Sequence, residues 1–263
     1  MKKKTQQKQA KKPWKTLAVV FLMMVWVGAS IIGAQLVVGN IMLGVLGRKL
    51  FLSPVPTAIF SALSYVLAMI LIIFIPPKFL EIHRKKHGKK PVSKPTRKSL
   101  GLNEWPTWTD IGLAPAGFLT YLLIAFALTA LFQLFPWFNA NEAQDVGFSV
   151  YLTGVDRAIA FIVLVVVAPI AEEIIFRGWL YDKLRGKFLE QYSNVVSIIA
   201  STFLVSLLFG IIHMQWNVGV NVFAMSIVLC GLREITGTIY AGILMHMLKN
   251  GLAFYLLYIV GIG

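Results

Sequence analysis

The chain has 263 residues, of which 57% are hydrophobic, and its 25 basic against 11 acidic side chains give a net charge of +14. The apolar share exceeds the about 45–50% that is usual for soluble domains, and apolar runs of about 20 residues recur. These features exclude an ordinary soluble domain and predict a multi-pass helical protein of the cell membrane. A single cysteine, Cys230, excludes a disulfide framework.

The excess positive charge is concentrated in two segments. Seven Lys and Arg residues precede residue 17, and nine lie between Lys78 and Lys98. Basic clusters beside apolar runs are the positive-inside pattern, and they also attract anionic lipid. We therefore expect both segments in the cytoplasm, with anionic lipid as a partner, and we expect no nucleic-acid binding.

The sequence predicts an all-α bundle of about seven membrane spans with the N-terminus inside. A basic tail, residues 1–16, precedes a span that is too long for a signal peptide, and residues 39–54 should form a loop or interfacial segment. A basic linker, residues 78–104, follows the second span, and the acidic loop at 137–155 should lie outside because it has no Lys or Arg. The predicted spans are 17–38, 56–75, 111–135, 156–180, 195–214, 217–232 and 238–260.

Two adjacent carboxylates and an arginine lie near the end of the fourth predicted span. Each charge inside a membrane costs roughly 2.5–3.5 kcal/mol on insertion scales, which makes Glu172, Glu173 and Arg177 a candidate functional site. Glu173 and Arg177 are four residues apart and should pair on one helix face. Glu172 lies about 100° around the helix and should lack a counter-ion. Pro169 should kink the helix just before them.

Three further polar side chains interrupt the apolar C-terminal half. His213 follows Phe209 by four residues, and His246 precedes Asn250 by four, so the spacing places each pair on one helix face. Groups of this kind in hydrocarbon must contact one another or line a wet cavity. We therefore expect one shared site.

The depth of His213 does not match the other members of this predicted site. Glu172 and His246 each lie about eight residues, or roughly 12 Å, from the inner boundary of their spans. His213 falls near the outer end of the span at 195–214. Either that boundary is displaced, or the helix is tilted or broken near Gly210.

A carboxylate, two imidazoles and an amide, with no serine in a nucleophile setting, suit the activation of water. The carboxylate would take a proton from water, and the donors would stabilise the developing oxyanion. Zinc is the alternative cofactor, since Glu and His are good ligands. It is disfavoured because the chain has no His-Glu-x-x-His helix and because Asn is a poor zinc ligand.

The order Glu-Glu-x-x-x-Arg, Phe-x-x-x-His and His-x-x-x-Asn on successive spans resembles the CPBP (CAAX prenyl protease and Abi bacteriocin-processing) intramembrane proteases. The likeness covers about residues 157–252 and includes the stretch from Leu232 to Thr238, whereas the first 150 residues carry none of it. It implies a catalytic core at 155–263, preceded by N-terminal membrane helices at 17–154.

The resemblance also implies roles for the individual residues and no metal cofactor. Glu172 would be the base that activates water, and His213 would orient that water. His246 and Asn250 would form the oxyanion site. Glu173, Arg177 and Phe209 would support these four. The family was once classed as metalloproteases, but the resemblance favours a glutamate-dependent mechanism.

Two functions from different classes remain open. The first is an intramembrane endopeptidase that cuts a membrane-embedded or membrane-associated protein or peptide. By analogy with bacterial relatives, its substrate would be a bacteriocin or pheromone precursor rather than a prenylated tail. The second is a non-proteolytic immunity factor, scaffold or transporter with the same fold. The complete set of Glu, two His and Asn favours the first, and a transporter would more often show two related halves with broken helices.

Overall fold

The computed structural model describes residues 13–86, 95–142, 148, 152 and 154–261, except for the side chains of residues 79–84. Within these ranges every regular element is helical, and four of them, labelled η, are π-helical stretches. The elements are α1 (Pro13–Phe51), α2 (Pro54–Met69), η1 (Ile70–Phe74), α3 (Ile75–Lys86), α4 (Trp108–Phe132), α5 (Gly154–Phe161), η2 (Ile162–Val167), α6 (Ala168–Glu173), η3 (Ile174–Tyr181), α7 (Asp182–Leu189), α8 (Asn194–Ile211), α9 (Trp216–Thr236), α10 (Tyr240–Tyr255) and η4 (Leu256–Val260).

Seven helices of the described chain are long and apolar enough to cross a membrane, which confirms the predicted multi-pass all-α fold. Each predicted span has its counterpart, although the ends shift by several residues. The loop or interfacial segment predicted at 39–54 is wrong in its first part, because α1 continues well past residue 38 and leaves helical geometry only at Gly47, where φ is 71° and ψ is 161°. Glycine adopts this conformation readily, and a short helical stretch to Phe51 follows the kink.

Parts of three predicted segments lie outside the described residues. These are most of the basic tail, residues 87–94 of the linker, and residues 143–147, 149–151 and 153 of the acidic loop. The first turns of α1 lie beside the α7–α8 turn, because Gln191 Nε2 donates to Thr16 Oγ1 over 2.7 Å. Which side of the membrane this end faces stays a prediction.

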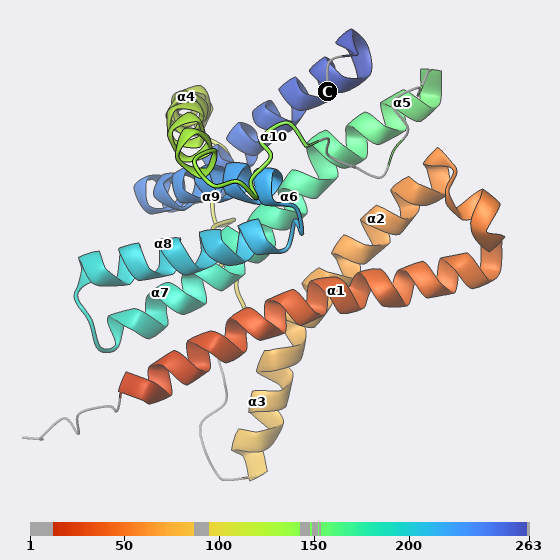
Figure 1. The fold of residues 1–263 in the computed structure, drawn as a ribbon. Coiled ribbons are helices and arrows are strands. Elements are labelled where there is room, and N and C mark those ends of the chain that lie inside the picture. Colours follow the sequence, from red (N-terminus) through yellow and green to blue (C-terminus); the bar gives the residue numbers. More distant parts are fainter. Residues whose placement is uncertain (1–12, 87–94, 143–147, 149–151, 153, 262–263) are drawn as a thin grey trace, which may run out of the picture.

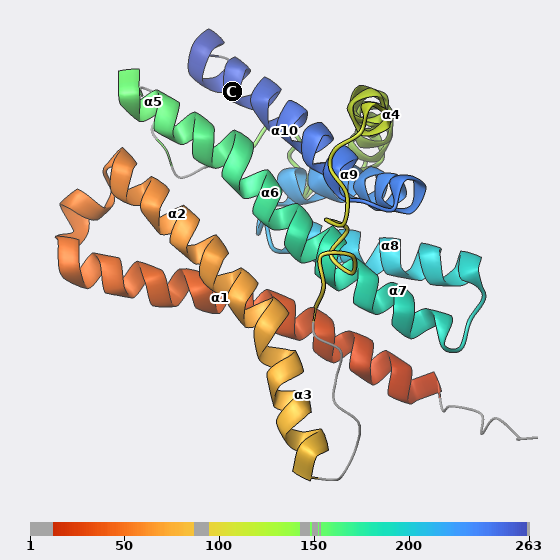
Figure 2. The same ribbon diagram turned by 180° about the vertical axis from the view of Figure 1, so that it is seen from behind.

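A single continuous helix, Gly154–Leu189, organises the bundle. It consists of α5, η2, α6, η3 and α7, and it carries both adjacent carboxylates in α6. Figures 1 and 2 show the α1–α2 hairpin on one side of this central helix and α8, α9, α10 and α4 on the other. The central helix is therefore the element that both halves of the chain share.

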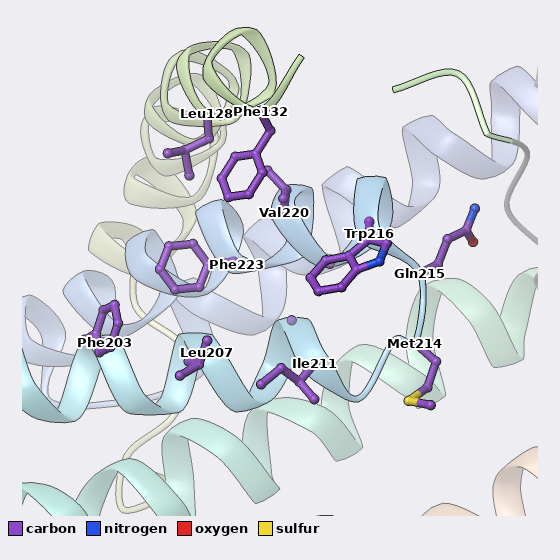
Figure 3. Close-up of a pocket in the computed structure, with 12 residues that line it drawn as sticks. Leu128, Phe132, Phe203, Leu207, Ile211, Met214, Gln215, Trp216, Val220 and Phe223 are labelled. Atoms are coloured by element: carbon purple, nitrogen blue, oxygen red, sulfur yellow. The ribbon is translucent and has the colours of Figure 1, made fainter. Parts of the chain in front are cut away.

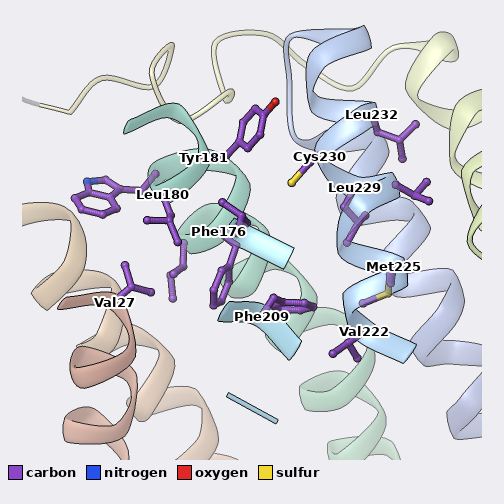
Figure 4. Close-up of a cluster of buried hydrophobic side chains, with 14 of the residues drawn as sticks. Val27, Phe176, Leu180, Tyr181, Phe209, Val222, Met225, Leu229, Cys230 and Leu232 are labelled. Carbon is purple, nitrogen blue, oxygen red and sulfur yellow. The ribbon is translucent and has the colours of Figure 1, made fainter. Parts of the chain in front are cut away.

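The bundle core is apolar and centres on the contacts of the central helix with α8 and α9. Figure 4 shows Phe176 and Phe209 close together, with Met225 and Leu229 of α9 on the facing side. Many large apolar side chains of the spans are exposed instead, among them Phe21, Leu123 and Phe126. In a membrane bundle such outward-facing side chains contact lipid, and helix packing depends on close contacts rather than on exclusion from water.

Candidate active site

Glu173 lies at the centre of a buried polar cluster. Arg177 Nη1 donates to Glu173 Oε1 over 2.9 Å, and both side chains are fully buried. This confirms the pairing predicted from the four-residue spacing, although the chain passes from α-helical to π-helical geometry between the two residues. A buried charge needs such a partner, because removal of one member strands the other in a low-dielectric interior.

His246 of α10 completes this cluster and connects it to Glu172. Its Nδ1 lies 3.1 Å from Glu173 Oε1, and its Nε2 lies 3.8 Å from Glu172 Oε2. A carboxylate that is paired with arginine can only accept a hydrogen bond, so Nδ1 carries the hydrogen. Nε2 then faces Glu172 as an acceptor in the neutral ring, or as a donor in the doubly protonated ring. The contact between His246 and Glu173 was not foreseen from the sequence.

Glu172 is not unpartnered, which corrects the prediction from sequence. The hydroxyl of Tyr65, in α2, donates to Glu172 Oε1 over 2.6 Å. Lys249 is also near enough to Glu172 for an electrostatic interaction. The only available signal for Tyr65 was its place in the middle of the second span, since membrane tyrosines usually gather near the two interfaces.

His213 lies in the turn between α8 and α9 rather than on the fifth span, because α8 ends at Ile211. Its Nδ1 lies 2.7 Å from the carbonyl oxygen of Phe209 and must donate to it, which leaves Nε2 as an acceptor. Burial lowers the pKa of His213 below its ordinary value, and the nearby charge of Glu172 only partly opposes this. The ring is therefore neutral at neutral pH.

The predicted end of the fifth span is displaced: α8 ends at Ile211, three residues before residue 214, and it crosses α9 closely just before that end. A Cβ at Gly210 would lie 2.8 Å from the carbonyl oxygen of Gly219, so only glycine permits the close crossing of α8 and α9 at this point. The helix is not broken at Gly210. It ends one residue later, and Met214 adopts a positive φ of 56° in the turn.

Phe209 packs against both histidines. Its ring centroid lies 5.1 Å from that of His213 and 6.1 Å from that of His246, in edge-on contacts. The guanidinium carbon of Arg177 lies 4.6 Å from the centroid of the same ring. Phe209 therefore packs against three of the predicted site residues, which come from η3, the α8–α9 turn and α10.

Asn250 is held more tightly than the sequence suggested. Its Nδ2 donates to the carbonyl oxygen of Leu164 over 2.9 Å. The central helix cannot satisfy this carbonyl itself, because the amide of Ala168 donates to Val163 and the next residue, Pro169, has no N–H. One amide hydrogen of Asn250 thus replaces the donor that the proline lacks, and the second remains for other partners.

The described side chains offer no set of three potential metal ligands. Among the residues that the structure describes, no three His, Cys, Asp or Glu side chains converge as metal ligation requires. Nδ1 of each site histidine is bonded to a protein oxygen, which leaves Nε2 of each ring for other partners.

A cavity of about 510 Å³ lies between α4, α8 and α9, apart from this cluster. Figure 3 shows its aromatic lining, which includes Phe132, Trp216 and Phe223. None of the predicted catalytic residues lines it, and Gln215 is its one polar side chain among the described residues. It offers no group for general acid–base chemistry.

Comparison with protein families identifies the region that carries the cluster. Residues 154–252 match the family model described as type II CAAX prenyl endopeptidase Rce1-like. This region is a CAAX-protease domain. It extends from α5 into α10 and holds every predicted site residue, whereas Tyr65 lies outside it. No curated protein and no solved structure matches the chain.

Proposed function

We propose that the chain is an intramembrane endopeptidase that hydrolyses a peptide bond of a membrane-associated protein or peptide with water activated by Glu172. A CAAX-type endopeptidase in general follows from the family domain. The assignment of Glu172 as the base depends on the position of its Oε2, which lies 3.8 Å from His246 Nε2 at the edge of the buried cluster. Its side chain keeps 15% exposure, whereas Glu173 has none.

The hydrogen-bond directions support a role for each group in the attack. Water can donate one hydrogen to Glu172 Oε2 and the other to Nε2 of neutral His213, which leaves an oxygen lone pair for the scissile carbonyl carbon. Glu172 takes the first proton as the C–O bond forms, and it later returns that proton to the leaving amine as the C–N bond breaks.

The developing oxyanion needs donors in the same place. His246 can donate from Nε2 when its ring is doubly protonated, while its Nδ1 is held by Glu173 Oε1 at 3.1 Å. Asn250 can donate its second amide hydrogen while the first holds the carbonyl of Leu164. Preorganised donors of this kind usually contribute the largest single part of catalysis.

The mechanism is proposed to need no metal, and the lack of a convergent ligand set among the described side chains supports this. Elemental analysis of the purified, fully active protein tests it directly. Substoichiometric metal is expected in the wild type. A metal at one per chain, lost in His213→Ala or His246→Ala, would replace the metal-free mechanism with a zinc mechanism.

The substrate class is open between two chemistries. The matched family model names CAAX prenyl endopeptidases, whereas the resemblance of the sequence motifs to bacteriocin-processing proteases suggests unmodified bacteriocin or pheromone precursors. The protein reconstituted into liposomes should therefore be given one CAAX-ended peptide in farnesylated and unmodified forms, with mass spectrometry of the products. Preference for one form assigns the substrate class.

The same assay tests the base and the alternative function. Glu172→Gln keeps the size of the side chain and removes its basicity, so it should abolish cleavage while Glu104→Gln, on an exposed residue of the linker, leaves it intact. Full activity in Glu172→Gln would end the assignment. If the folded wild-type protein cleaves neither peptide, the result would favour a non-proteolytic function as an immunity factor or scaffold.

A further inference from the structure

The geometry points to Tyr65 as a positioning residue for Glu172, which makes the N-terminal hairpin α1–α2 part of the active site. This inference rests on the proposed function and goes beyond it, because Tyr65 lies 107 residues from Glu172 and outside the matched domain at 154–252. The decisive contact is the 2.6 Å hydrogen bond from the Tyr65 hydroxyl to Glu172 Oε1.

Because of this bond, the two carboxylate oxygens of Glu172 have different partners. Oε1 accepts from Tyr65, and Oε2 is the oxygen that faces His246 Nε2 at 3.8 Å. A carboxylate on a flexible side chain would otherwise rotate and exchange the two oxygens. With Oε1 held, Oε2 is the atom presented to water, and alignment of a reacting group is a substantial part of catalysis.

A tyrosine suits this task because it is a neutral donor. Glu173 is held by the cation of Arg177 over 2.9 Å, which neutralises it and suits a supporting role. A phenol holds Glu172 with comparable directionality and adds no positive charge beyond that of nearby Lys249, so the carboxylate remains available to accept a proton. The two adjacent glutamates thus differ in the group that holds them, an arginine for Glu173 and a neutral hydroxyl for Glu172.

The packing of α2 brings the hydroxyl to this point. Its buried positions are the small residues Ala58, Ser64 and Ala68, which allow close approach to neighbouring helices. Ala58 packs in one cluster with Val163 and Val165 of η2. Figures 1 and 2 agree that α2 runs alongside the central helix near α6. The site is therefore completed by a helix that the family domain does not include.

Tyr65→Phe tests the inference, since it removes one oxygen atom and keeps the ring. We expect kcat to fall at least about tenfold, with KM changed by less than about twofold, because a hydrogen bond to a charged group is lost at the base and not at the substrate. The matched control is Tyr181→Phe, whose buried hydroxyl donates to Glu234 Oε1 over 2.9 Å away from the site. It should reduce thermal stability comparably and leave kcat within about twofold.

A second substitution covers the case in which Tyr65→Phe does not fold. Ring-fluorinated tyrosine at position 65 keeps the shape and the bond but makes the phenol a stronger donor. A positioning role predicts that kcat changes with the number of fluorines at constant thermal stability. A hydrogen bond that only joins α2 to the bundle predicts a constant kcat.

The outcomes separate this inference from the proposed function. Both peptide forms of the liposome assay serve as probes. If the wild type cleaves, Glu172→Gln is inactive and Tyr65→Phe keeps the wild-type kcat, the positioning role is refuted and the endopeptidase function stands. If a folded wild type cleaves neither peptide, the function fails and the inference fails with it. A loss of kcat in Tyr65→Phe that Tyr181→Phe does not share establishes it.

Discussion

Asn250→Ala should lower the free energy of unfolding because it removes the donor to a carbonyl that the central helix cannot satisfy. In the wild type, the Asn250 amide lies 2.9 Å from Leu164 O. Ala168, four residues after Leu164, donates to Val163, and Pro169 has no hydrogen to offer. After the substitution, this carbonyl would stand unpaired in a buried helix.

The size of the effect follows from this lack of a replacement. Interhelical hydrogen bonds in membranes contribute about 0.6 kcal/mol on average and about 1.7 at most. A buried acceptor left wholly unsatisfied costs about 1–3 kcal/mol. We therefore expect Asn250→Ala to destabilise the protein by about 1–2 kcal/mol, which is above the membrane average because no local donor can substitute.

A double-mutant cycle with Pro169→Ala isolates the cause. Alanine at position 169 restores a backbone N–H at the place where the π-helical turn would use it. In that background Asn250→Ala should cost less than about 0.5 kcal/mol. Unfolding in mixed micelles with increasing denaturing detergent, followed by tryptophan fluorescence, measures all four free energies.

The control is Asn40→Ala, and one result would refute the reasoning. Asn40 Nδ2 also donates to a backbone carbonyl, that of Leu36, over 2.7 Å, but no proline interrupts the helix there. It should therefore have little effect. If Asn250→Ala is equally costly with Pro169 and with Ala at position 169, within about 0.3–0.5 kcal/mol, the missing proline hydrogen is not the reason for the contact.

Three other predictions concern charge and topology. Glu173→Gln leaves Arg177 without its partner in the buried cluster and should lose about 3–5 kcal/mol of stability, whereas Glu172→Gln should unfold near the wild-type temperature. Equal losses of thermal stability in the two variants would contradict this prediction. Because burial lowers the pKa of His213, the unfolded chain, with a pKa of about 6.5, binds this proton more readily than the folded one. The contribution of His213 to stability should therefore be full above about pH 6.5 and should fall as the pH drops from there to the lowered pKa of the folded state. Denaturation titrations of His213→Asn should lack this component of the pH dependence. Reporters fused within the 78–104 linker and at Asn141 should report opposite membrane sides, with the linker in the cytoplasm, and a shared side would refute the topology.

The sequence alone determined the features that depend on neighbours along one helix. Hydropathy identified all seven spans, because a membrane helix must satisfy its backbone internally over about 20 apolar residues. The spacing of Glu173 and Arg177 determined their ion pair for the same local reason. The three motifs also pointed to the family before any contact was known, and the match at 154–252 confirmed it.

Tertiary structure alone decided how the helices meet. Hydropathy does not specify which face of α2 lies against the central helix, so the bond between Tyr65 and Glu172 could not be derived from residues 107 positions apart. Hydropathy likewise did not place the end of α8 at Ile211, with His213 in the turn beyond it, or the close approach of Gly210 to Gly219 on another helix. Asn250 bonds to Leu164 because a proline on a different span lacks one hydrogen. Lipid is as apolar as the outer side chains, so burial of apolar surface does not decide which membrane helices pack together. Small residues and a few polar groups decide it, and their contacts form only when the helices pack.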